Sequence, residues 1–157
     1  MLRLELIAAS NRQPGWVDAG YAEYADRLRG RCTLELKVLP LARRTASMPP
    51  DRALADEGAR MARAIPSGAH VVALAEAGKP LSTKDLAAKL GRWSECGAPV
   101  ALLLGGPDGI GTEALARAAE RWSLSPLTLP HGLARILVAE ALYRACSLLQ
   151  NHPYHRA

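Results

Sequence analysis

The sequence predicts an α/β domain built on a parallel sheet. Short apolar runs of strand length alternate with longer segments whose apolar residues recur at helical spacing, which is typical of strand–helix repeats. Two runs, residues 71–75 and 100–104, are apolar without interruption, as expected for central strands covered on both faces. The 157 residues contain no internal repeat, so we expect a single domain over residues 1–157.

Two strands and two helices are expected in the first part of the chain. Residues 2–8 alternate and then become fully apolar, and residues 33–39 alternate cleanly, so both segments are predicted strands. Residues 16–29 and 51–65 have the periodicity of amphipathic helices. Residues 43–50 are basic and end in prolines, and we expect a flexible loop there.

The third and fourth apolar runs are each followed by turn residues and a helical pattern. The third helix is expected over residues 84–96, with Ser82 or Thr83 as its N-cap. A weaker helix is expected over residues 112–121, where Thr112 could be the cap. Residues 122–129 are apolar and hydroxyl-rich, and prolines limit regular strand pairing there.

The segment 133–149 is predicted to be a helix that is apolar around most of its circumference. Such a helix must be buried, either in the core or against a second subunit. Glu140 and Arg144 lie four residues apart with the acid first, which is the favourable order for a helix ion pair. In so apolar a helix the pair is either a matched structural pair or part of a polar cavity.

Composition limits the partners and the compartment. The net charge of +5 suits a polyanionic partner and equally suits a merely solvated basic surface. The three cysteines are far apart and no Cys/His ligand spacing occurs, so we expect buried free thiols and no metal. Residues 2–10 are too short and too charged for a secretory signal, and no run approaches a membrane span, so we expect a cytoplasmic protein without a membrane partner.

Three features could carry chemistry. The turn Gly105-Gly106-Pro107-Asp108-Gly109 follows the fourth strand, where parallel sheets collect ligands, although a tight turn without a ligand is an equally simple reading. His131 immediately precedes the last helix. The tail 151–156 combines imidazole, phenol and guanidinium groups, which could contact RNA and move a proton, or could be a frayed basic end. These residues alone indicate an α/β protein with an anionic or nucleotide-like ligand.

Several motifs together resemble the ribosomal RNA large subunit methyltransferase H family, which belongs to the SPOUT class. The resemblance extends over essentially the whole chain. It rests on Trp16 with Tyr21-Ala22-Glu23-Tyr24, Gly78-Lys79-Pro80, Leu103-Leu104-Gly105-Gly106-Pro107-Asp108-Gly109, Trp122-Ser123-Leu124-Ser125, Leu127-Thr128-Leu129-Pro130-His131, Arg135, Val138-Ala139-Glu140-Ala141-Leu142-Tyr143-Arg144-Ala145 and Asn151-His152-Pro153-Tyr154-His155-Arg156.

The resemblance implies an α/β knot, in which the C-terminal segment threads a loop to form a trefoil knot, and a homodimer. It implies methyl transfer from S-adenosylmethionine to N3 of a pseudouridine in large-subunit ribosomal RNA, within the assembled ribosome. S-adenosylhomocysteine is the expected product. A tRNA methyltransferase of the same class and a non-catalytic RNA-binding or ribosome-assembly protein are the alternatives.

The resemblance also implies which residues form the site. The expected donor contacts are Leu74, Gly105, Leu124, Ser125, Pro126, Leu127, Thr128 and Leu129. For catalysis, His155 or His131 would handle the proton, Arg144 or Arg135 would stabilise developing negative charge, and Tyr154 would stack on a base. We expect the tail to order over the pocket when RNA binds.

Overall fold

The computed structural model describes the backbone of residues 1–156 and the side chains of residues 1–154. Its centre is a five-stranded sheet in the order β2-β1-β4-β3-β5, in which every neighbouring pair is parallel. The predicted parallel α/β fold class is therefore confirmed. The strands are β1 (Leu2–Ala9), β2 (Cys32–Leu39), β3 (His70–Pro80), β4 (Val100–Leu104) and β5 (Glu120–Ser123).

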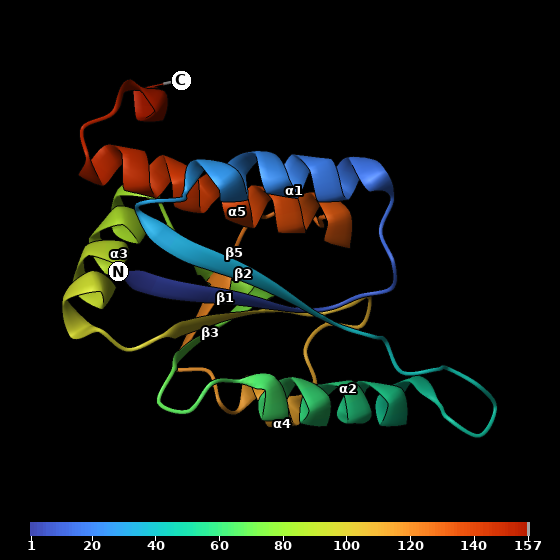
Figure 1. Ribbon diagram of the computed structural model, residues 1–157. Coiled ribbons are helices and arrows are strands. Elements are labelled where there is room, and N and C mark those ends of the chain that lie inside the picture. The colour runs from blue at the N-terminus through green and yellow to red at the C-terminus, as the bar shows by residue number, and fades with distance from the viewer. Residues whose placement is uncertain (157) are drawn as a thin grey trace.

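Helices cover both faces of the sheet (Figure 1). One layer consists of α1 (Gly15–Arg27), α3 (Thr83–Cys96) and α5 (His131–Leu149), with α5 packed between the other two. The opposite layer consists of α2 (Pro50–Ala64) and the short α4 (Thr112–Leu115). A final 3-10 turn, η1 (Pro153–Arg156), packs back against α5.

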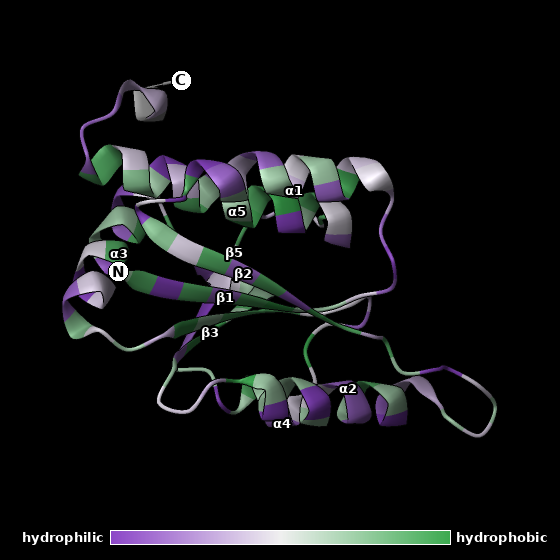
Figure 2. Ribbon diagram, viewed as in Figure 1, coloured by the Kyte–Doolittle hydropathy of each residue, from purple (hydrophilic) through white to green (hydrophobic). Residues whose placement is uncertain are grey.

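Successive side chains of a strand point to opposite faces of the sheet, so the core has two parts, one beneath each layer of helices. Val100, Leu102 and Leu104 of β4 face α1, α3 and α5. Ala101 and Leu103 of the same strand face α2 and α4. Because both faces of β4 are covered, its five residues are all buried, which explains the uninterrupted apolar run in the sequence. Figure 2 shows the same organisation, with apolar strands between helices whose outward sides are more polar.

The predicted helix over residues 112–121 is wrong in length. It ends at Leu115, and its expected cap Thr112 is the first helical residue, preceded by Gly111 without a side-chain cap. The backbone N–H of Ala119 donates to the carbonyl of Val71 over 2.8 Å, which directs the following residues alongside β3 as strand β5. Sheet pairing here outweighs a weak helical propensity.

Strand β3 extends five residues beyond the predicted run and passes Trp122 twice. Both Leu74 and Lys79 lie opposite Trp122, with a bulge between them. Gly78 makes the second passage possible, because a Cβ there would lie 2.4 Å from the carbonyl carbon of Trp122. The chain therefore loops out after Leu74 and returns against the backbone of β5.

Local signals elsewhere are confirmed in part. Ser82 caps α3 in a capping box with Asp85, with an accepted bond of 3.1 Å from the Asp85 N–H. The expected flexible loop before α2 contains a bridge between Thr45 and Met48 and is held by Arg44, as described below. Among the cysteines, Cys32 and Cys146 are buried as expected, but Cys96 is exposed. Of the helices in residues 1–156, none combines the length and apolarity that a bilayer crossing requires.

Candidate active site

A cleft of about 970 Å³ opens at the carboxyl end of β4, beside the point at Leu74 where β3 and β4 stop pairing. This is the edge where parallel sheets collect ligands, and the volume is within the range of small-molecule sites. The cleft lies between the glycine turn after β4 and the segment before α5. Its lining residues are Leu74, Ala75, Glu76, Ala77, Leu104, Gly105, Gly106, Pro107, Asp108, Gly109, Ile110, Thr128, Leu129, Pro130, His131 and Ala134.

The glycine turn folds tightly onto itself. A Cβ at Gly105 would lie 2.4 Å from the carbonyl carbon and oxygen of Gly109, so no larger residue fits there without moving the turn. Gly109 has a φ of 88° and donates its N–H to the carbonyl of Gly106 over 3.0 Å. These glycines let bare backbone form one wall of the cleft.

The segment between β5 and α5 forms the opposite wall. Most of the expected donor contacts lie here or directly across from it: Leu74, Gly105, Thr128 and Leu129 line the cleft. Leu124, Ser125 and Leu127 line a smaller adjoining pocket of about 90 Å³, which shares Leu74 and Leu129 with the cleft. Of the eight expected donor contacts, only Pro126 lines neither space.

His131 is held at the base of the cleft by two neighbours. Its Nδ1 lies 3.2 Å from the carbonyl oxygen of Gly105, and its Nε2 lies 3.2 Å from Nη2 of Arg135. A carbonyl can only accept and a guanidinium can only donate, so Nδ1 carries the hydrogen and Nε2 is the acceptor. Burial, together with the charge of Arg135, lowers the pKa of His131, whereas the Gly105 contact opposes this shift. His131 is therefore neutral at pH 7.

Arg135 lies behind His131 and outside the cleft lining. It is 3% exposed, and burial lowers its pKa, although the Asp18 carboxylate at 3.8 Å opposes this effect. Its Nε and the hydroxyl of Tyr21 are buried without hydrogen-bond partners among the described residues. Burial raises the pKa of Tyr21 to about 12, and the charge of Arg135 partly offsets the shift. Arg135 is thus a buried cation whose guanidinium contacts His131 of the cleft.

Two carboxylates that the sequence reading did not single out as site residues also line the cleft. Glu76 follows the apolar run of β3, and Asp108 lies in the glycine turn. Glu76 directly follows the predicted strand at residues 71–75 and Asp108 follows the one at residues 100–104, which was an available signal because ligands gather at that edge. Asp108 is paired with Arg44, so Glu76 is the carboxylate that favours positive charge on a ligand in the cleft. Among the described residues, no three His, Cys, Asp or Glu side chains gather closely enough to hold a metal ion.

Arg44 connects the glycine turn to α2. Its guanidinium pairs with the buried carboxylate of Glu57 and donates to Asp108 over 2.8 Å. Glu57 also accepts the backbone N–H of Ala42 over 2.9 Å. We call this set the Arg44 network. It fixes the loop before α2 against the turn that lines the cleft, and nothing in the local sequence pattern indicates so long-range a contact.

The tail residues gather at the far end of α5. Arg144 Nη2 lies 2.7 Å from Glu140, and the Tyr154 hydroxyl donates to the same carboxylate over 3.1 Å. The Tyr154 ring also packs on Tyr143, with centroids 4.6 Å apart. The predicted Glu140–Arg144 pair is confirmed as a matched pair. Burial, followed by hydrogen bonds with Tyr24 and Glu140, raises the pKa of Tyr154, so its phenol is protonated at neutral pH.

The proposed catalytic residues therefore fall into two groups. His131 and Arg135 lie at the cleft, whereas Arg144 lies 13 residues along the same helix, or about 20 Å at 1.5 Å per residue. Tyr154 belongs to the second group through its contact with Glu140. The side chain of His155 lies outside the described part of the structure.

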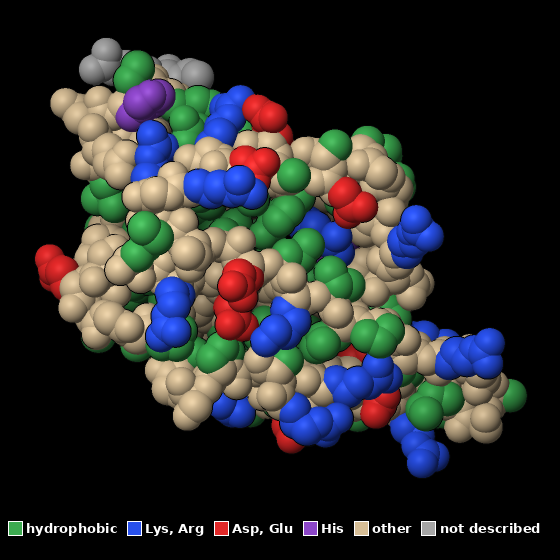
Figure 3. All heavy atoms as spheres, viewed as in Figure 1, with side chains coloured by type: hydrophobic (Ala, Val, Ile, Leu, Met, Phe, Trp, Pro, Cys, Tyr) green, Lys and Arg blue, Asp and Glu red, His purple; other side chains and the backbone are tan. Residues whose placement is uncertain are grey.

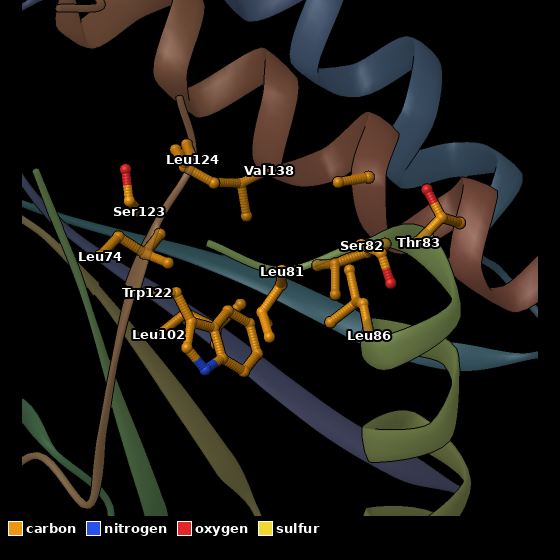
Figure 4. Close-up of a pocket in the computed structure, with 12 residues that line it drawn as sticks. Leu74, Leu81, Ser82, Thr83, Leu86, Leu102, Trp122, Ser123, Leu124 and Val138 are labelled. Atoms are coloured by element: carbon orange, nitrogen blue, oxygen red, sulfur yellow. The ribbon is translucent and has the colours of Figure 1, made fainter. Parts of the chain in front are cut away.

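A third pocket shares Ser123 and Leu124 with the smaller adjoining pocket and lies between β5, α3 and α5 (Figure 4). It has a volume of about 110 Å³, and its walls are mostly apolar side chains of β5, α3 and α5. Leu74 borders this pocket as well as the cleft. No charged side chain lines it, and Ser82, Thr83 and Ser123 are its polar residues.

Comparisons with known proteins agree on one family. A family model described as "Predicted SPOUT methyltransferase" matches residues 2–155. The chain is 54% identical over 156 residues to Ribosomal RNA large subunit methyltransferase H of Alkalilimnicola ehrlichii, covering 99% of this chain and all of that protein. It is 50% identical over 155 residues to the protein of the same name from Methylococcus capsulatus, with 99% and 100% coverage.

A solved structure shares the fold. The probable methylase family protein from Haemophilus influenzae Rd KW20 superposes with a TM-score of 0.54 at 16% identity. The match covers 98% of this chain and 69% of that one. At this identity the likeness concerns the arrangement of helices and strands alone.

Proposed function

Because this chain belongs to the SPOUT methyltransferase family, we propose that it transfers a methyl group from S-adenosylmethionine to large-subunit ribosomal RNA. The observation that carries the proposal is the cleft where β3 and β4 stop pairing, in a chain that matches the whole length of proteins named as ribosomal RNA large subunit methyltransferases. The target we propose is N3 of a pseudouridine in the assembled ribosome. That substrate places the protein in the cytoplasm.

The cleft fits the proposed donor in shape and in charge. Leu74, Gly105 and Leu129 offer apolar surface and backbone groups on which an adenosine could lie. Glu76 supplies negative charge for a donor that carries a sulfonium and an ammonium group, whereas the charge of Asp108 is already paired with Arg44. When bound, this donor supplies an activated methyl group and leaves as neutral S-adenosylhomocysteine. The protein's part is to align the methyl group with the target nitrogen.

The target N3–H must lose its proton. The contacts of His131 favour a group of the tail as the acceptor of that proton. Both ring nitrogens of His131 are engaged, Nδ1 with Gly105 and Nε2 with Arg135. We therefore assign His131 to fixing the glycine turn, with the Arg135 cation behind it favouring negative charge in the cleft. His155 is then the proposed proton acceptor. Arg144 and Tyr154 are proposed to hold the RNA base beside it.

This assignment requires a homodimer. In one chain the tail group and the cleft group are about 20 Å apart along α5, so the tail cannot reach its own donor site. The α5 layer exposes large apolar side chains at Leu133 and Leu137, and the adjoining wall exposes Leu127 at 74%. A second copy covering this face would bury those side chains and bring its tail to the cleft. The double passage of β3 beside Trp122 supports the trefoil knot that we propose for the C-terminal third.

The decisive experiment is mass spectrometry of ribosomal RNA from a strain that lacks the gene, with and without its restoration. We expect one methylated pseudouridine in the large-subunit RNA to disappear and to return. Methylation lost from tRNA instead would favour a tRNA methyltransferase. An unchanged set of modifications, with no heat of S-adenosylmethionine binding in calorimetry, would indicate a non-catalytic RNA-binding protein.

A further inference from the structure

Three exposed arginines lie at the same edge of the sheet as the glycine turn, two on loops after strands and one at the start of a helix. Arg12 follows β1, Arg43 follows β2, and Arg52 lies in the first turn of α2. Since β2, β1 and β4 are neighbours in the sheet and run parallel, their carboxyl-end loops emerge along one edge. We call Arg12, Arg43 and Arg52 the basic rim.

Contacts fix each of these loops next to the glycine turn. A Cβ at Gly106 would lie 2.6 Å from Leu41 and 3.3 Å from the carbonyl oxygen of Ala9, so the turn touches the ends of both β1 and β2. A Cβ at Gly111 would lie 2.4 Å from the carbonyl oxygen of Leu54, which places the start of α2 beside the end of the turn. The segments that carry the rim therefore pack directly against the glycine turn.

The charges of the rim are available to a ligand. Arg44, next to Arg43 in the chain, points inward and is occupied by Glu57 and Asp108. None of the three rim arginines makes an ion pair among the described residues, although Asp51 is an exposed carboxylate next to Arg52 in sequence. On the visible face, Lys and Arg side chains gather over α2 and the loop that precedes it (Figure 3).

We propose that the basic rim binds phosphates of the RNA backbone and so positions the substrate over the donor cleft. The inference rests on the proposed function, which supplies a polyanionic substrate. Arginines beside a binding cleft suit phosphate oxygens, and such contacts fix the register and orientation of a nucleic acid without reading its sequence. The Arg44 network fixes the loop that carries Arg43 against the glycine turn, so a strand bound to the rim would keep a defined position relative to the cleft.

The test measures how RNA affinity depends on salt. The probe is large-subunit ribosomal RNA extracted from cells that lack the gene, titrated at fixed Mg²⁺ with wild-type protein and with the triple variant Arg12→Met/Arg43→Met/Arg52→Met. Each lost phosphate contact lowers the slope of log affinity against log salt by about 0.7–0.9, so we expect a decrease of about 2–3. Between about 50 and 200 mM salt, the wild type should then lose roughly 15- to 60-fold more affinity than the variant.

A matched control removes the same charge elsewhere. Arg3, Arg92 and Arg117 are exposed arginines without an ion pair among the described residues, and they lie toward the opposite edge of the sheet. Their triple Met variant should keep the wild-type slope, and both variants should bind S-adenosylmethionine with wild-type affinity in calorimetry. Equal slopes for the two variants, or an unchanged slope for the rim variant, would overturn the rim. If the slope of log affinity against log salt falls only in the rim variant but the wild type methylates no RNA, phosphate binding by the basic rim is supported and the proposed function is wrong.

Discussion

Replacing Arg44 by Met should destabilise the protein, because it leaves a buried carboxylate without its counter-ion. The Glu57 side chain is 3% exposed and would keep only the hydrogen bond from the Ala42 backbone. Breaking a fully buried ion pair in this way costs about 3–5 kcal/mol. Arg44 itself is 26% exposed, so water can approach the site and we expect a smaller loss, of about 2–3 kcal/mol.

Thermal unfolding followed by circular dichroism measures this loss. For a chain of this size each kcal/mol shifts Tm by about 2–4 °C, so the variant should melt roughly 4–12 °C below the wild type. Arg43→Met is the matched control: this exposed neighbour makes no ion pair with the described residues, and its removal should change stability by no more than about 0.5 kcal/mol. The double variant Arg44→Met/Glu57→Gln should recover part of the loss, since a neutral amide is less costly to bury than a carboxylate.

Two results would refute the reasoning. If Arg44→Met melts within about 2 °C of the wild type, Glu57 does not depend on that counter-ion. If adding Glu57→Gln lowers Tm further instead of restoring it, the loss does not come from an unpaired charge. Donor affinity, measured in parallel by calorimetry, should fall in the Arg44 variant and not in the Arg43 control, because Asp108 loses its anchor.

Three further predictions concern the cleft and the tail. Gly105→Arg should abolish S-adenosylmethionine binding in calorimetry while Gly15→Ala, at a position with open space, leaves it intact; retained affinity at Gly105 would mean that the donor binds elsewhere. Deletion of residues 152–157 should leave far-ultraviolet circular dichroism unchanged and remove methyl transfer to ribosomes, whereas undiminished turnover would exclude a role for the tail. Because burial lowers the pKa of His131 in the folded state, the unfolded chain binds the proton first as pH falls, so stability should decrease below about pH 6.5. His131→Asn should flatten that part of the curve of stability against pH. A variant with the same curve as the wild type would contradict the lowered pKa.

The fold could be predicted where local pattern and tertiary environment agree. The uninterrupted run at β4 indicated a strand covered on both faces, and Ser82 indicated the start of α3 through its own side chain. Strand β5 could not be predicted, because Glu120–Ser123 pairs only through its contact with β3, some fifty residues earlier. The shortening of α4 has the same cause.

The location of the site could be predicted from the sequence, but the contacts between its residues could be predicted only in part. Leu74 and Gly105 lie where ligands of parallel sheets bind, and the same rule could have identified Glu76. Arg44 could not, since its partner Asp108 lies 64 residues away and no periodicity connects them. The separation of His131 from Arg144 is plain once both are placed on one straight helix, but the resemblance presented them as a single constellation.

The stacking of Trp93 on Trp122, with ring centroids 5.7 Å apart and planes 8° from parallel, provides an optical reporter. One indole belongs to α3 and the other to β5, so their coupled near-ultraviolet circular dichroism signal can develop only once the last third of the polypeptide has docked. The third indole, Trp16, is 58% exposed and should contribute mainly solvent-quenchable fluorescence. Stopped-flow refolding could therefore time the arrival of the C-terminal third separately from the formation of helices, without any added label.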